Sequence, residues 1–80
     1  MLKFQRVIDR YSKVMEILKK HDFSESSMTQ FTKAFESITH AAPEVIHDKA
    51  YIFALVCVDH QQEFIEKNID VEIQQILTSQ

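Results

Sequence analysis

The sequence predicts an all-α protein, a small antiparallel bundle of three long helices plus a short fourth helix. Three observations lead to this prediction. The 80 residues include no glycine, and tight hairpin turns depend on glycine for positive φ. Apolar residues recur at spacings of three and four along most of the chain, as they do on one face of a helix. Residues 50–58 are all apolar, so neighbouring helices would have to cover them.

The first predicted helix covers about residues 2–20. Its apolar residues form one broad face. They are Phe4, Val7, Ile8, Tyr11, Val14, Met15 and Leu18. The pattern stops at His21, where the helix is expected to give way to a loop.

The second predicted helix covers about residues 27–39. Two pairs around its start have the spacing of a capping box, Asp22 with Glu25 and Ser27 with Gln30. The serine-rich stretch of residues 24–27 also suits an N-terminal turn, because serine side chains can accept hydrogen bonds from its backbone N–H groups. A stripe at spacings of three, four and three then follows. It consists of Met28, Phe31, Phe35 and Ile38.

The third predicted helix is long and covers about residues 43–67. Pro43 suits its first position, because the missing N–H would have no partner there. One apolar stripe consists of Ile46, Ala50, Phe53, Cys57, His60 and Phe64, and a second of Tyr51, Ala54, Val58 and Ile65. The middle of the helix is therefore apolar all round, and neighbours are expected on more than one side. Residues 51–58 also have strand propensity, but a lone strand would need a dimer for its pairing.

A short fourth helix is predicted over about residues 71–78. Asn68 can take the left-handed conformation that ends a helix, and Asp70 is a candidate N-cap for the next one. Because 80 residues leave no room for a second core, residues 1–80 are expected to form a single helical domain.

The composition argues against an enzyme. Without glycine, the chain cannot form a phosphate-binding loop, a dinucleotide fingerprint, a nucleophile elbow or a calcium loop. No carboxylates are placed where burial would separate their pKa values for acid–base work. We therefore predict no catalytic residues, no cofactor and no small-molecule substrate.

Two pairs of residues have the spacing of metal ligands. Glu44 and His47 form an E-x-x-H pair, but di-iron bundles need two such pairs and two further glutamates. Cys57 and His60 lie one helical turn apart, but a zinc site needs two more ligands. Glu44 and His47 are better explained as residues of a first helical turn, and Cys57 and His60 as residues at the edge of the core. No metal site is therefore predicted.

The charges are distributed unevenly. Residues 1–20 hold six basic and two acidic residues, a net +4, whereas residues 21–80 hold three basic and ten acidic, a net −7, which together give −3. A basic stripe of Lys3, Arg6, Arg10 and Lys13 on the first helix is the candidate for an alternative function, a small nucleic-acid-binding regulator. The acidic remainder would repel a polyanion, which argues against nucleic acid. Whether that acidic surface imitates nucleic acid or only confers solubility stays open.

The favoured hypothesis is a non-enzymatic protein–protein interaction module, such as a small adaptor, regulator, immunity protein or secretion-type co-chaperone. Apolar surface around the third helix that its neighbours leave uncovered would bind another protein or a second copy of the chain. The predicted partner-binding residues are Tyr51, Ile52, Leu55 and Phe64. A single cysteine, no signal peptide and no membrane span indicate a cytoplasmic protein.

Overall fold

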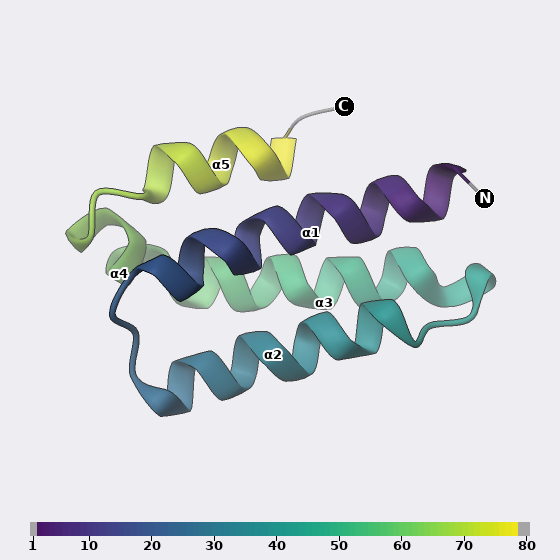
Figure 1. Cartoon of the computed structure of the whole chain (residues 1–80), viewed down its shortest axis with the longest axis horizontal. Helices are drawn as coiled ribbons and strands as arrows, with labels where there is room; N and C mark the ends of the chain where they lie inside the picture. The colour runs from purple at the N-terminus through teal and green to yellow at the C-terminus, as the bar shows by residue number, and fades with distance from the viewer. Residues whose placement is uncertain (1, 79–80) are drawn as a thin grey trace.

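The computed structural model describes the backbone of residues 2–78 and the side chains of residues 5–78. The chain folds into a helical bundle, which confirms the predicted all-α class (Figure 1). The helices are α1 (Leu2–Lys20), α2 (Glu25–Thr39), the 3₁₀ turn η1 (Pro43–Val45), α3 (Ile46–Asp59), α4 (Gln61–Glu66) and α5 (Asp70–Thr78). No strand occurs in residues 2–78, so the strand alternative for residues 51–58 is wrong.

Helices α1, α2, α3 and α5 run alternately in opposite directions along the long axis of the bundle (Figure 1). Helices α1, α2 and α3 contact one another in all three pairs, and α5 packs on α1. In Figure 1, α3 lies behind α1 and α2. This arrangement covers α3 from the side of α1 and α2, and it decides which of its apolar residues are buried.

The core is built around the ring of Phe31. The Phe53, Phe64 and Phe23 ring centroids lie 5.9, 6.0 and 6.2 Å from it, and Tyr11 adds a contact of 4.9 Å with Phe53. These aromatic contacts join residues of α1, α2, α3 and α4 in one cluster. The other buried apolar residues are Val14, Met15, Ile17, Leu18, Ala34, Ile38, Ile46, Ala50, Cys57, Ile69 and Ile73.

Helix α2 begins two residues earlier than predicted. Ser24 has an extended backbone and its side chain accepts a hydrogen bond from the Ser27 backbone N–H at 3.1 Å, so Ser24 is the N-cap. The Ser24 hydroxyl also donates to the Ser27 hydroxyl at 3.1 Å, and Ser27 is buried. The predicted caps Asp22 and Ser27 were wrong, because Ser24, between them, has the backbone conformation that a cap requires.

The single long helix predicted for residues 43–67 was wrong. Pro43 does stand at the start, but it begins a 3₁₀ turn in which the Val45 N–H donates to the Ala42 carbonyl oxygen at 3.0 Å. A second break lies at His60, where φ is −108° and ψ is 12°. The His60 Nδ1 lies 2.8 Å from the Val56 carbonyl oxygen, and its ring lies 4.8 Å from the Phe31 ring. The backbone hydrogen bonds continue through this position, because the His60 N–H donates to the Val56 carbonyl oxygen at 3.2 Å and the Phe64 N–H donates to the His60 carbonyl oxygen at 3.1 Å.

Asn68 ends α4 as predicted, with a positive φ of 61°. The Asn68 N–H donates to the Ile65 carbonyl oxygen at 3.1 Å, and the Ile69 N–H donates to the Phe64 carbonyl oxygen at 3.0 Å. This pair of hydrogen bonds is a Schellman motif. The Ile73 N–H donates to the Ile69 carbonyl oxygen, so Asp70 is the first residue of α5 and was wrong as its cap.

Candidate functional site

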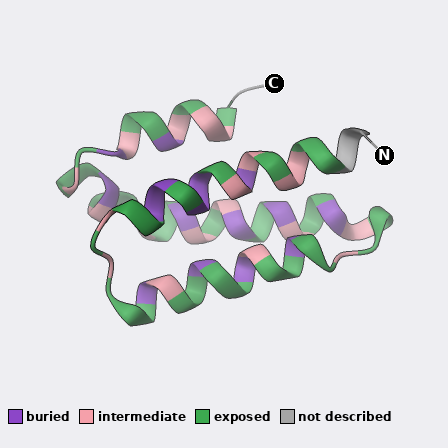
Figure 2. Cartoon of the chain, viewed as in Figure 1, coloured by how far each residue is buried: buried purple, intermediate pink, exposed green. Residues whose placement is uncertain are grey.

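Four large apolar side chains lie exposed on one side of α3. Tyr51, Ile52, Leu55 and Val58 are 65, 47, 44 and 62% exposed. Tyr51, Leu55 and Val58 follow one line at spacings of four and three, and Ile52 lies beside that line. The opposite side of α3 is buried, and Figure 2 shows buried and exposed residues alternating along this helix. We call these four residues the α3 face.

The α3 face is exposed because α1 and α2 pack on the opposite side of α3. The apolar run of residues 50–58 is therefore covered on one side only, although its composition predicted neighbours on more than one side. The structure places Tyr51, Ile52 and Leu55 at the surface, where the predicted partner-binding role requires them. Val58 was not singled out from the sequence, although its place on the second apolar stripe was the available signal.

Phe64 was predicted to bind a partner, and this prediction was wrong. Its side chain is fully buried, 6.0 Å from the rings of both Phe23 and Phe31. Phe64 lies one helical turn after His60, on the stripe that contains Phe53 and Cys57, and like them it belongs to the core. A partner cannot reach this residue without unfolding the bundle.

A hollow of about 400 Å³ lies between α1 and α3, beside the α3 face. Tyr51 belongs to both, so the hollow and the face are continuous. We call it the α1–α3 hollow. It is lined by Arg6, Val7, Arg10 and Tyr11 of α1 and by His47, Ala50, Tyr51 and Ala54 of α3.

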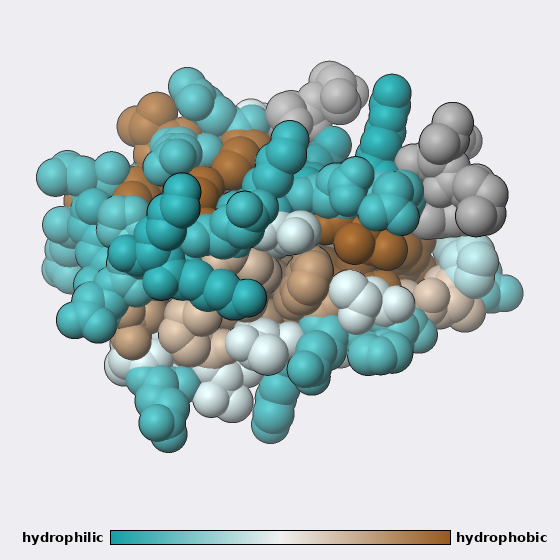
Figure 3. Space-filling model, in the orientation of Figure 1, coloured by the Kyte–Doolittle hydropathy of each residue, from teal (hydrophilic) through white to brown (hydrophobic). Residues whose placement is uncertain are grey.

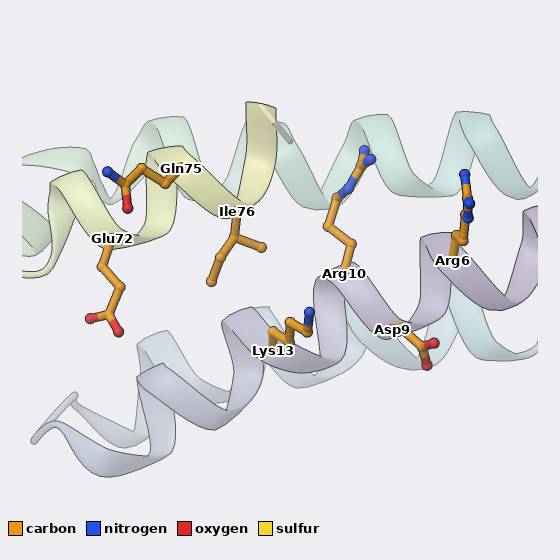
Figure 4. A pocket seen from close by; sticks show the side chains of 7 residues that line it. All are labelled: Arg6, Asp9, Arg10, Lys13, Glu72, Gln75 and Ile76. Atoms are coloured by element: carbon orange, nitrogen blue, oxygen red, sulfur yellow. The ribbon is translucent and has the colours of Figure 1, made fainter. Parts of the chain in front are cut away.

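A second hollow, of about 600 Å³, lies between α1 and α5. It brings together three members of the predicted basic stripe, whereas the Lys3 side chain lies outside the described residues. In Figure 4, the Arg6 and Arg10 side chains leave α1 on the same side and Asp9 points away from α5. The lining residues are Arg6, Asp9, Arg10, Lys13, Glu72, Gln75 and Ile76. This surface carries charges of both signs, and Figure 3 shows mostly hydrophilic side chains over α1.

The Cys57 thiol is not activated as a nucleophile in this fold. Cys57 is buried, and burial raises the pKa of its thiol from 9.0 to about 12, so the thiol is protonated near neutral pH. Burial also raises the pKa of the Tyr11 phenol above its ordinary value of 10.0. The ring of His60 is engaged with the Val56 carbonyl oxygen and the Phe31 ring.

Metal-ligating side chains are dispersed in the described part of the chain. Within residues 5–78, no three His, Cys, Asp or Glu side chains come together where they could hold a metal ion. Glu44 and His47 are both exposed near the beginning of α3, and Cys57 is in the core. The two pairs with metal-ligand spacing therefore lie in different environments.

The helices described here include none with the length and apolar character needed to cross a bilayer. Comparison with protein-family models, with curated proteins and with solved structures gives no significant match to this chain. Any function must therefore be argued from the α3 face, the two hollows and the charges around them.

Proposed function

We propose that this protein acts without catalysis, by binding another protein through the α3 face. The observation that supports the proposal is the exposure of four large apolar side chains on one side of one helix. The largest contiguous apolar patch on a soluble protein is often an interaction surface. Adaptors, regulators, immunity proteins and secretion-type co-chaperones of the cytoplasm are the roles that such a small binding module would suit.

The size of the patch agrees with a binding role. The four residues expose on the order of 400 Å², taking about 150–250 Å² for a fully exposed side chain of this size. At about 25 cal/mol per Å², burying this surface contributes roughly 10 kcal/mol before the entropy cost of association. Covering the α3 face would therefore offset much of the entropy cost of association, and contacts around the face would add to the affinity.

The hollows do not favour an enzyme. Both lie between helices at the surface, and Cys57, the one thiol, lies in the core rather than in either lining. The titratable groups that line them include exposed Arg6, Asp9, Lys13 and Glu72, which water can solvate. A catalytic site would instead bury such groups to adjust their pKa values.

Site-specific photocrosslinking in the native cell tests the proposal. A photoreactive amino acid at Leu55 should give a discrete adduct with another protein, and Ile52→Asp in the same chain should remove that adduct. The matched control is the same probe at Thr32, an exposed position on α2. The absence of an adduct at Leu55, or the same adducts at Leu55 and Thr32, would refute binding through the α3 face.

Nucleic-acid binding is the alternative that this experiment must separate. The gathering of Arg6, Arg10 and Lys13 around one hollow favours it, whereas Asp9 and Glu72 in the same hollow oppose it. Binding of duplex DNA or single-stranded RNA that weakens steeply with salt and is lost in Arg6→Glu would support the alternative. In that case Leu55→Asp should leave the binding intact.

A further inference from the structure

The α3 face is bordered by basic side chains on the side of α1. The α1–α3 hollow, which shares Tyr51 with the face, is lined by Arg6 and Arg10 from α1. His47 of α3 lines the same hollow and is exposed. Arg6 is also exposed, so its guanidinium group is accessible to a molecule lying on the face. Basic side chains of α1 therefore border the Tyr51 end of the apolar surface.

The two ends of the α3 face are acidic. Asp48 lies one turn before Ile52, and Asp59 lies one turn after Leu55. Both aspartates are exposed. The apolar surface thus has arginine side chains beside Tyr51, on the side of α1, and a carboxylate at each end of its length. An occupant must match this arrangement of charges as well as the apolar side chains.

A second copy of the chain does not match these charges. A two-fold axis that pairs two α3 faces antiparallel brings Asp48 of one copy near Asp59 of the other, twice. A parallel pair brings each aspartate near its own counterpart. Like charges placed in this way oppose association.

A helix matches the surface better than an extended segment. The described residues contain no sheet edge to which a strand could add. The line of Tyr51, Leu55 and Val58, with the α1–α3 hollow alongside, forms the kind of apolar track that receives the apolar stripe of a helix. Side chains at the border of that stripe would then lie over the hollow.

We infer that the α3 face binds an amphipathic helix of another protein, with acidic residues along the border of its apolar stripe that faces Arg6. This inference rests on the proposed function and specifies the partner. The apolar stripe supplies affinity by covering the four exposed side chains. The carboxylates of the partner form ion pairs with the Arg6 side and fix the orientation of the bound helix.

A display library of helical peptides tests the inference directly. The peptides carry a fixed leucine stripe at i, i+4 and i+7, and the positions that border the stripe are randomised. Selection on the wild-type protein should enrich Asp and Glu on one border. Selection on Arg6→Glu should enrich Lys and Arg there instead, whereas Lys19→Glu, the matched control elsewhere on α1, should leave the preference unchanged.

The selected peptide is then measured against single variants. Arg6→Glu should weaken its binding by about tenfold or more, and added salt should weaken binding to the wild type but hardly to Arg6→Glu. Leu55→Asp should abolish binding. Peptides that bind with no charge preference, and whose binding depends on Leu55 alone, would overturn this inference and leave the proposed function standing.

Two other outcomes overturn the inference. If no library peptide binds and Leu55 gives no photoadduct, the proposed function fails together with it. If sedimentation shows a dimer that Leu55→Asp dissociates, a second copy covers the face instead. The mass in solution therefore has to be measured first, at the protein concentration used for selection.

Discussion

Lys67, which follows α4, forms a hydrogen bond with Asp22 in the loop between α1 and α2. Its Nζ donates a hydrogen bond to the Asp22 carbonyl oxygen at 2.7 Å and lies 5.0 Å from the Phe23 ring centroid. Lys67 directly follows α4, and 45 positions separate it from Asp22. The Phe23 ring in turn contacts Phe31 and Phe64, so a surface lysine covers the edge of the aromatic core.

Lys67→Met should destabilise the fold by about 1–2 kcal/mol, because it removes a charged hydrogen bond and a cation–π contact while keeping the apolar stem. Urea unfolding measures the change, and hydrogen exchange should speed up most in residues 21–24. Lys33→Met, at an exposed position on α2, is the control and should change stability by less than about 0.5 kcal/mol. Equal effects of the two variants would contradict a specific role for Lys67.

Phe53 and Leu55, two residues apart in the apolar run of α3, should respond to a charge in opposite ways. Leu55→Asp, on the α3 face, should change the free energy of unfolding by less than about 1 kcal/mol, because its side chain is 44% exposed. Phe53→Asp should unfold the protein, since an unpaired charge would replace a fully buried ring. Circular dichroism melts of the two variants check this. A large loss of stability in Leu55→Asp would mean that the face is covered in the folded chain.

Stability should fall at alkaline pH because of Cys57. Burial raises the pKa of its thiol from 9.0 to about 12, so the folded state holds a proton that the unfolded state loses first. Its contribution is therefore fully present below about pH 9 and is lost as pH rises toward 12. For the Cys57 thiol this difference in pKa corresponds to roughly 4 kcal/mol in the free energy of unfolding. Burial also raises the pKa of Tyr11, so its phenol adds to the loss of stability at alkaline pH.

Urea unfolding at several values between pH 8 and about 11 should show this decline, and Cys57→Ala should have a shallower dependence on pH. Alkylation of Cys57 by iodoacetamide at neutral pH should also be slow in the folded protein and fast in urea. Rapid alkylation without denaturant would show that the thiol is accessible.

Asn68 should be sensitive to substitution because of its backbone alone. Its φ of 61° suits glycine better than any residue with a Cβ atom. Asn68→Gly should be neutral or stabilise by up to about 1 kcal/mol, and Asn68→Val should destabilise by about 1–2 kcal/mol. Thermal melts compare the two variants. Because Asn68 is exposed, a loss of packing would not explain the result.

Local signals in the sequence determined the helical elements of this protein. The apolar spacing marked α1 within its observed bounds, Pro43 marked the beginning of the third segment and Asn68 marked the end of α4. These predictions succeeded because each depends on the backbone preference of one residue or on the period of one helix. The same period grouped Phe53, Cys57 and Phe64 on one stripe, and the structure buries all three.

Only the tertiary structure decided which apolar residues stay at the surface. The period of a helix gives the direction of each side chain, but long-range packing decides on which side the neighbouring helices lie. Helices α1 and α2 both pack on the side of Phe53, which leaves Leu55 exposed, whereas Phe64 continues the stripe of Phe53 and Cys57 into the core. The proximity of Arg6 to Tyr51 likewise depends on how α1 crosses α3, which no local pattern specifies.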